Sequence, residues 1–133
     1  IPNKLDITTD KRSLTFPQGQ PEEVFVTVQL VEVKTGRQVN RPGALYLRSN
    51  YDKIGYPTEP ALDQRGAARV SLTLAPPDQS DAKLNGSIYL WAVLDSEEAD
   101  DTGEGRLLFT IPVPTSQERI RVQSDTGAGK RVQ

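Results

Sequence analysis

Apolar and polar residues alternate with a period of two along much of this chain, and that alternation restricts the fold more than any other sequence feature. Residues 24–31 show it most clearly, because Val24, Val26, Val28 and Leu30 all share one parity. A period of two places every second side chain on one face of an extended strand, and β-branched residues favour that conformation. The pattern returns in residues 45–47, 70–74, 88–94 and 107–113. The chain is therefore predicted to form its core from half-buried β-strands.

Turn-forming segments separate these runs at short intervals. They comprise residues 17–21, 34–37, 41–43, 63–66, 75–78, 85–86 and 102–105. Their Gly, Pro, Asn and Asp residues favour tight turns, and only residues 78–84 suit a single helical turn. Short alternating segments with frequent turns predict an all-β, antiparallel sandwich of about seven strands. We expect its core to contain Leu14, Val24, Val26, Val28, Leu45, Leu47, Val70, Leu72, Leu74, Leu90 and Phe109.

The 133 residues suit one domain, and we predict the sandwich over residues 1–115. Residues 116–133 are expected to be a linker or an extra edge strand. Within them, residues 124–130 have the Ser, Thr and Gly content of a linker, whereas residues 117–123 contain alternating apolar residues that suit edge pairing. Because the chain contains no Met, we also expect it to be a segment of a longer protein.

The absence of His and Cys narrows the chemistry open to this chain. His is the commonest general base near neutral pH, and Cys supplies thiolate nucleophiles and metal ligands. A net charge of −2 argues against nucleic-acid binding, which normally requires a basic surface. No apolar stretch approaches the length of a membrane span, so we expect no membrane insertion. We therefore predict that the chain is not an enzyme.

Several segments follow one another in a characteristic order. A strand and Gly turn at residues 13–19 precede the long alternating strand, a Gly turn at 34–39 and a strand ending in Ser at 45–49. Residues 62–73 then have the sequence L-D-Q-R-G-A-A-R-V-S-L-T. This order resembles a bacterial immunoglobulin-like domain of the invasin and intimin type, whose pattern at that point is T-D-x-x-G-x-A-x-V-x-L-T. The resemblance implies an immunoglobulin-like sandwich that is extracellular, on the cell surface or periplasmic, and joined to neighbouring domains of the same polypeptide.

The segment between residues 95 and 104 is strongly acidic. Asp95, Glu97, Asp100 and Asp101 would offer the carboxylate oxygens that Ca²⁺ prefers. Their spacing differs from that of an EF-hand loop. The alternative is a solvated hairpin tip whose charge opposes aggregation. We therefore predict no required cofactor, with Ca²⁺ binding by these four carboxylates as a hypothesis.

Aromatic residues concentrate in two places, the loop at residues 50–60 and the strand at 88–94. Exposed Tyr51, Tyr56 and Trp91 would suit sugar stacking or a protein contact, because aromatic side chains offer a large contact area. The alternative for the loop is that its aromatics cover an open edge of the core. On the strand, either the even-numbered or the odd-numbered residues face the core, and alternation alone leaves both open.

These features predict a non-catalytic structural or interaction module of a larger bacterial surface or secreted protein. Its role would be that of a spacer, an adhesin-type domain or an accessory domain, with another protein or a glycan as a further partner. The alternative is a carbohydrate- or partner-binding accessory domain of an enzyme that uses its loop aromatics. Binding to a glycan array that is lost in Tyr51→Ala and Tyr56→Ala would favour the alternative.

Overall fold

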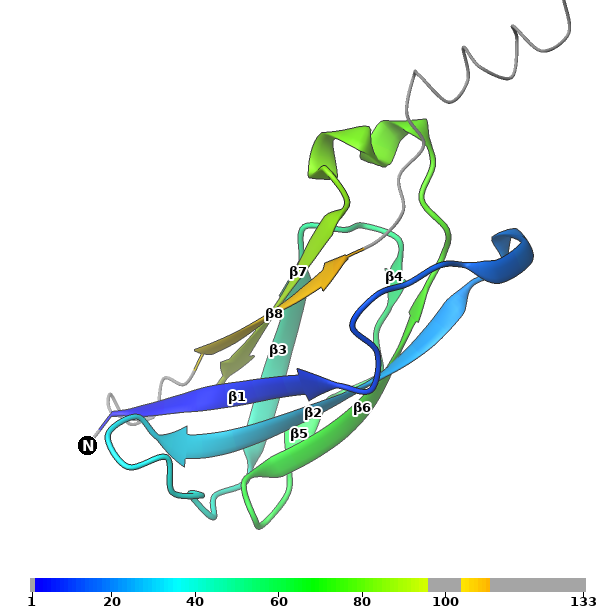
Figure 1. Cartoon of the computed structure of the whole chain (residues 1–133). Coiled ribbons are helices and arrows are strands. Elements are labelled where there is room, and N and C mark those ends of the chain that lie inside the picture. The colour runs from blue at the N-terminus through cyan, green and yellow to red at the C-terminus, as the bar shows by residue number, and fades with distance from the viewer. Residues whose placement is uncertain (1, 96–103, 111–133) are drawn as a thin grey trace, which may run out of the picture.

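Two antiparallel β-sheets pack face to face in the computed structural model, which describes residues 2–95 and 104–110 (Figure 1). The first sheet has the order β1-β2-β6-β4 and comprises β1 (Asn3–Thr9), β2 (Glu22–Glu32), β6 (Ala67–Leu74) and β4 (Ile54–Gly55). The second has the order β5-β3-β7-β8 and comprises β5 (Ala61–Leu62), β3 (Gly43–Ser49), β7 (Ser87–Leu94) and β8 (Glu104–Thr110). This arrangement matches the ABED and CFG sheets of an immunoglobulin-like sandwich, so the predicted fold class is confirmed.

The core lies between the two sheets and follows the alternation of the sequence. In the first sheet, Val26 of β2 pairs in register with Val70 of β6, and both side chains are buried. The predicted core residues that are buried are Leu14, Val24, Val26, Val28, Leu45, Val70, Leu72, Leu74 and Leu90. Leu47 is only half-buried and packs against this cluster. The prediction for the Phe109 side chain falls outside what the structure describes.

Packing against the first sheet decides which parity of β7 faces inward. Ile88, Leu90, Ala92 and Leu94 are buried, whereas the odd-numbered residues of the strand are half-buried on the outer face. The strand therefore has one fully apolar face in the core and one face that carries Tyr89, Trp91 and Val93 to the outside.

The turn before β6 is stabilised by hydrogen bonds to the carboxylate and the carbonyl oxygen of Asp63. Gly66 has φ of +72° and donates its N–H to the carbonyl oxygen of Asp63 at 2.9 Å. The Asp63 carboxylate accepts hydrogen bonds from the N–H groups of Arg65 at 2.8 Å and Ala67 at 3.2 Å. This turn is the first part of the segment that resembles the bacterial immunoglobulin-like pattern, and its geometry requires the glycine.

Two short 3₁₀ segments, η1 (Pro17–Gly19) and η2 (Gln79–Leu84), complete the described elements. The second agrees with the single helical turn expected over residues 78–84. The Asp78 carboxylate accepts the Ser80 N–H at 2.8 Å, and the Asp81 carboxylate accepts the Asp78 N–H at 2.9 Å. These reciprocal bonds form a capping box that fixes where η2 begins.

Several sequence predictions concern residues outside the described ranges. They are the linker or edge strand at residues 116–133, including the edge pairing of residues 117–123, and three of the four acidic residues proposed for Ca²⁺, Glu97, Asp100 and Asp101. No helix in the described part of the chain has the length and hydropathy of a membrane span.

Candidate binding face

Tyr51 is part of the core, and the prediction that it is an exposed loop aromatic is wrong. Its side chain is only 2% exposed, and its hydroxyl donates to the carbonyl oxygen of Ala75 at 2.5 Å. Burial, aided by the nearby negative charge of Asp81, raises the pKa of the Tyr51 hydroxyl to about 12. The residue follows β3 directly and turns back over the end of the sandwich, so it covers an edge of the core as the alternative interpretation expected.

The loop after Tyr51 is tied to η2 by an ionic cluster. The Lys53 ammonium group contacts the carboxylate of Asp81, which is itself buried, and lies 3.2 Å from the carboxylate of Asp78. Hydrogen bonding to Asp81 raises the pKa of Lys53, and hydrogen bonds from Ser80 lower the pKa of Asp78. These contacts connect two loops at one end of the sandwich and give this region a structural role.

Tyr56 is the loop aromatic that remains accessible, with 40% of its surface exposed. Partial burial raises the pKa of its hydroxyl, and a hydrogen bond with Ser49 opposes that rise. The loop therefore offers a single accessible aromatic side chain, and the pair of exposed tyrosines expected from the sequence does not form.

A different group of aromatics meets on the outer surface of the second sheet. The register pairs Arg48 of β3 with Trp91 of β7, and Tyr46 with Val93. Side chains directly opposite one another in an antiparallel pair lie on the same face and in contact distance. We call the surface formed by Tyr46, Arg48, Tyr89, Trp91 and Val93 the outer β3–β7 face.

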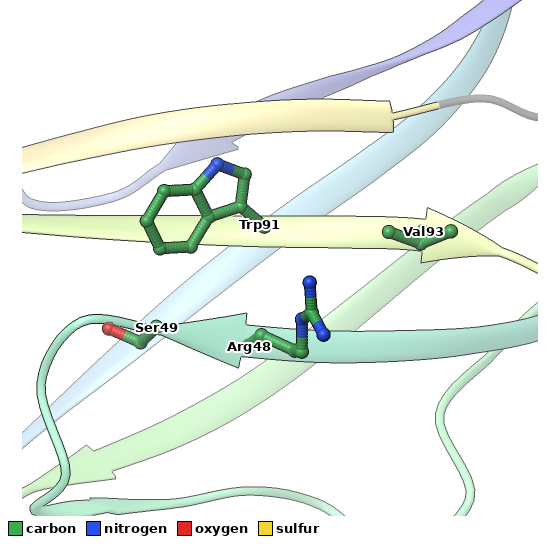
Figure 2. Close-up of a pocket in the computed structure, with 4 residues that line it drawn as sticks. All are labelled: Arg48, Ser49, Trp91 and Val93. Atoms are coloured by element: carbon green, nitrogen blue, oxygen red, sulfur yellow. The ribbon is translucent and has the colours of Figure 1, made fainter.

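The aromatic rings of Tyr89 and Trp91 stack against each other on this face. Their centroids are 5.9 Å apart, and their planes differ by 25°. Figure 2 shows the Trp91 indole ring nearly face-on in a view onto β3 and β7, with the strands of the first sheet behind. The two rings therefore form one compact aromatic pair on the outer face of β7.

A hollow of about 490 Å³ opens beside the indole ring. Among the described residues, Arg48, Ser49, Trp91 and Val93 line it (Figure 2). The Arg48 guanidinium reaches from β3 toward β7 and lies between Trp91 and Val93. The hollow thus combines an aromatic wall, a cation and a hydroxyl group, which are the components of a site for a polar ligand with an apolar face.

Hydrogen bonds hold the two strands together at both ends of this face. At one end, the Ser49 hydroxyl donates to the carbonyl oxygen of Tyr89 at 2.7 Å, and the Tyr89 N–H donates to the Asn50 side-chain oxygen at 2.8 Å. At the other end, the Tyr46 hydroxyl donates to the Asp95 carboxylate at 3.3 Å. The face is therefore built on paired strands whose positions are fixed before any ligand arrives.

The charge of Arg48 is not neutralised by any described residue, because none forms an ion pair with its guanidinium. Arg69, on the outer surface of the first sheet, has an aromatic partner instead, because its guanidinium lies 4.3 Å from the centroid of the Phe25 ring. The β7–β8 register places Arg106 opposite Trp91 and Glu104 opposite Val93, on the side of β7 away from β3. The outer β3–β7 face thus combines aromatic side chains with an arginine that has no ion-pair partner among the described residues.

Asp95 is the one proposed Ca²⁺ ligand within the described residues. It is exposed at the end of β7, and its N–H donates to the carbonyl oxygen of Ala44 at 2.9 Å. The described residues contain no group of three acidic side chains that would hold a metal ion. Because the other three carboxylates lie outside those residues, Ca²⁺ binding stays a prediction.

Sequence reasoning selected Trp91 but not its neighbours Tyr46, Arg48 and Tyr89. Tyr89 could have been selected from the sequence, because it lies two residues before Trp91 and so on the same face of the strand. Arg48 and Tyr46 were not, because their place beside Trp91 and Val93 depends on the β3–β7 register, which joins segments about forty residues apart.

Comparison with known proteins does not identify a family for this chain. The strand order agrees with the predicted fold class, an antiparallel β-sandwich. The resemblance to bacterial immunoglobulin-like domains stays a prediction. No model of a known protein family matches the chain, and no curated protein matches it either.

Proposed function

We propose that this chain is a non-catalytic interaction module of a larger bacterial surface or secreted protein, and that it binds through the outer β3–β7 face. The observation that carries the proposal is the stacked pair of Tyr89 and Trp91 beside Arg48, which has no ion-pair partner among the described residues. Tryptophan, tyrosine and arginine are the residues most enriched at the energetic centres of interfaces.

The support of this face by a sheet favours binding over a purely structural role. Arg48 and Trp91 belong to paired strands whose opposite sides are buried in the core, so ligand contact requires little ordering of the backbone. Tyr46, with 57% of its surface exposed, extends the aromatic area toward Val93. A domain that served only as a spacer would gain nothing from holding these side chains together on one outward surface.

The position of the module in a surface or secreted protein follows from the resemblance to bacterial immunoglobulin-like domains. An adhesin-type or accessory role fits a small sandwich that presents one binding face and is joined to neighbouring domains. An extracellular, cell-surface or periplasmic location belongs to the same proposal.

The experiment applies the labelled chain to an array of immobilised glycans and extracellular proteins. Trp91→Ala tests the face, and Phe25→Ala is the matched control because it removes an aromatic side chain beside an arginine on the opposite outer surface. We expect at least one array component to bind the wild type and Phe25→Ala but not Trp91→Ala. Binding that Trp91→Ala leaves intact would contradict the proposal.

A second candidate function is that of a carbohydrate-binding accessory domain of an enzyme. The Trp91 indole at the edge of the hollow favours it, because an aromatic ring suits the apolar face of a sugar ring. Tyr51 is buried and no longer belongs to this hypothesis, while Tyr56 is accessible on the neighbouring loop. A neighbouring catalytic domain in the full-length gene product would favour this candidate.

A further inference from the structure

We infer that the outer β3–β7 face binds carboxylate-bearing saccharides, with the Trp91 indole packing against a sugar ring and Arg48 pairing with a sugar carboxylate. This inference rests on the proposed function, since it assigns a ligand class to the same face. Three features carry it: the indole ring beside the hollow, the absence of an acidic partner for Arg48 among the described residues, and the unequal polarity of the two ends of the face.

The Trp91 indole supplies the apolar contact that a saccharide requires. Its ring face is turned toward the viewer in Figure 2, the side chain is half-buried, and the hollow lies beside it. The Tyr89 ring stacks against the indole, with centroids 5.9 Å apart and planes 25° apart, and supports its orientation. A pyranose ring has an apolar face of C–H groups, so a sugar ring that enters the hollow can pack against the indole.

Arg48 supplies the preference for a carboxylate. Its planar guanidinium presents paired donors that match the two oxygens of a carboxylate, and such charge-assisted bonds are stronger than neutral ones. Two other basic side chains already have acidic partners. Lys11 pairs with Glu22 at 3.2 Å, and Lys53 lies between Asp78 and Asp81. Arg48 projects into the hollow beside Trp91 without an acidic partner among the described residues.

The two ends of the face differ in charge, and this difference sets the direction of an acidic ligand. Asp95 lies beyond Val93 and accepts the Tyr46 hydroxyl hydrogen at 3.3 Å, so that end repels a carboxylate. The opposite end carries an amide, since the Asn50 side chain donates to the carbonyl oxygen of Ser87 at 3.3 Å. A bound saccharide would therefore place its carboxylate at Arg48 and extend over Trp91 and Tyr89 toward Asn50.

The experiment titrates the full chain with polygalacturonate, alginate and hyaluronan, and with the carboxyl-reduced form of each polymer as the matched neutral ligand. Trp91 is the one tryptophan of the chain, so its fluorescence reports ligand arrival at this face. Calorimetry measures the same affinity independently, and it also gives the affinity of variants that lack the tryptophan. We expect the wild type to bind at least one acid polymer about tenfold or more tightly than its reduced form.

Variants separate the two parts of the inference. Arg48→Gln is expected to bind the acid and reduced forms with similar affinity, whereas Arg48→Lys keeps part of the preference because the charge remains. Trp91→Ala is expected to weaken binding of both forms by about tenfold or more. Phe25→Ala and Arg69→Gln, on the opposite surface, keep the wild-type affinity. Thermal unfolding of each variant establishes that it is folded.

Two outcomes would overturn the inference: none of the three acid polymers binds, or each binds no better than its reduced form. The proposed function fails separately, on the array, when no component depends on Trp91. A neutral glycan or a protein that requires Trp91 would retain the proposed function and overturn the carboxylate class. Self-association that Trp91→Ala abolishes would identify a second copy of this chain as the occupant and would likewise overturn it.

Discussion

Gly66 shows how one residue can determine the conformation of a turn. Its φ of +72° belongs to the left-handed region, and a Cβ atom built there would lie 1.9 Å from the carbonyl oxygen of Val39. Any larger residue at position 66 would therefore be destabilising for two reasons: its backbone would be strained, and its Cβ atom would collide with the main chain of Val39. Gly36 has nearly the same φ, +74°, but its Cβ position has no atom within 4 Å.

These two glycines make a matched pair for a stability measurement. We expect Gly66→Ala to lower the free energy of unfolding by about 2–4 kcal/mol, because strain and collision add. Gly36→Ala meets only the strain, so its loss should be about 1 kcal/mol. Urea unfolding monitored by circular dichroism measures both. Equal losses in the two variants would mean that the Val39 segment moves aside without cost.

Tyr51 shows what residue identity alone leaves undecided. Its loop contains Asp, Lys, Gly and Pro, which suggests exposure, yet the side chain is buried and its hydroxyl is satisfied by the Ala75 carbonyl oxygen. That acceptor lies after β6, in a segment distant in sequence, so no local pattern could reveal it. The same separation explains why Arg48 was not selected as a neighbour of Trp91.

At the scale of elements, the carboxylate of Glu22 holds the middle of the connection between β1 and β2, while Asp10 accepts the Phe25 N–H at its start. Glu22 begins β2 and accepts the N–H groups of Thr15 and Phe16, each at 2.7 Å, as well as the Lys11 ammonium group at 3.2 Å. Phe16 has φ of +48° and a buried side chain, so this contact fixes an unfavourable backbone conformation that places an aromatic ring in the core. The hydrogen bond from Phe16, opposed by partial burial, lowers the pKa of Glu22.

The lowered pKa predicts a specific dependence of stability on pH. A carboxyl group whose pKa is lower in the folded state contributes stability above its ordinary value, which is 4.5 for Glu22, and loses it as the pH falls through the folded-state value. Glu22→Gln should therefore lower the free energy of unfolding at pH 7 by about 1–2 kcal/mol and flatten its decline between pH 5 and 2. Chemical unfolding across that range measures both effects.

Glu23→Gln is the control for this prediction. Its carboxylate accepts the Ser71 hydroxyl hydrogen at 2.6 Å on the outer surface, and its replacement leaves the contacts of Glu22 in place. An acid decline in Glu22→Gln as steep as in the wild type would assign the acid sensitivity to other carboxylates, such as Asp78 beside η2.

At the scale of the whole molecule, both sheets share one core. Leu72 of β6 and Leu90 of β7 come from opposite sheets and are both fully buried in the same cluster. Among residues 2–95, neither sheet has a second apolar layer on its outer surface, so each depends on the other for burial. The sandwich is therefore expected to unfold as one cooperative unit.

Leu72→Ala in the first sheet and Leu90→Ala in the second test whether unfolding is cooperative. Each should cost about 2–5 kcal/mol, because truncation of a fully buried leucine leaves a cavity. Since Trp91 is on the second sheet, its fluorescence and the circular dichroism of the whole chain should change at the same urea concentration in both variants. Val33→Ala, at a position 51% exposed, serves as the control with a cost under about 0.5 kcal/mol. Separate transitions for the two probes would show that the sheets unfold independently.

The sequence by itself determined the longer strands β2, β3, β6 and β7 and the buried parity of β2, β3 and β6, because these depend on alternation within a few residues. The two-residue strands β4 and β5 were not predicted, and the strand expected at the start of residues 13–19 does not form. The tertiary structure decided which parity of β7 faces inward, that Tyr51 is buried, and that Arg48 and Tyr46 lie beside Trp91 and Val93. Each of these depends on contacts between segments far apart in the chain. Alternation defines two faces of a strand, but only the opposing sheet and the cross-strand register determine which face is covered and which side chains meet on the other.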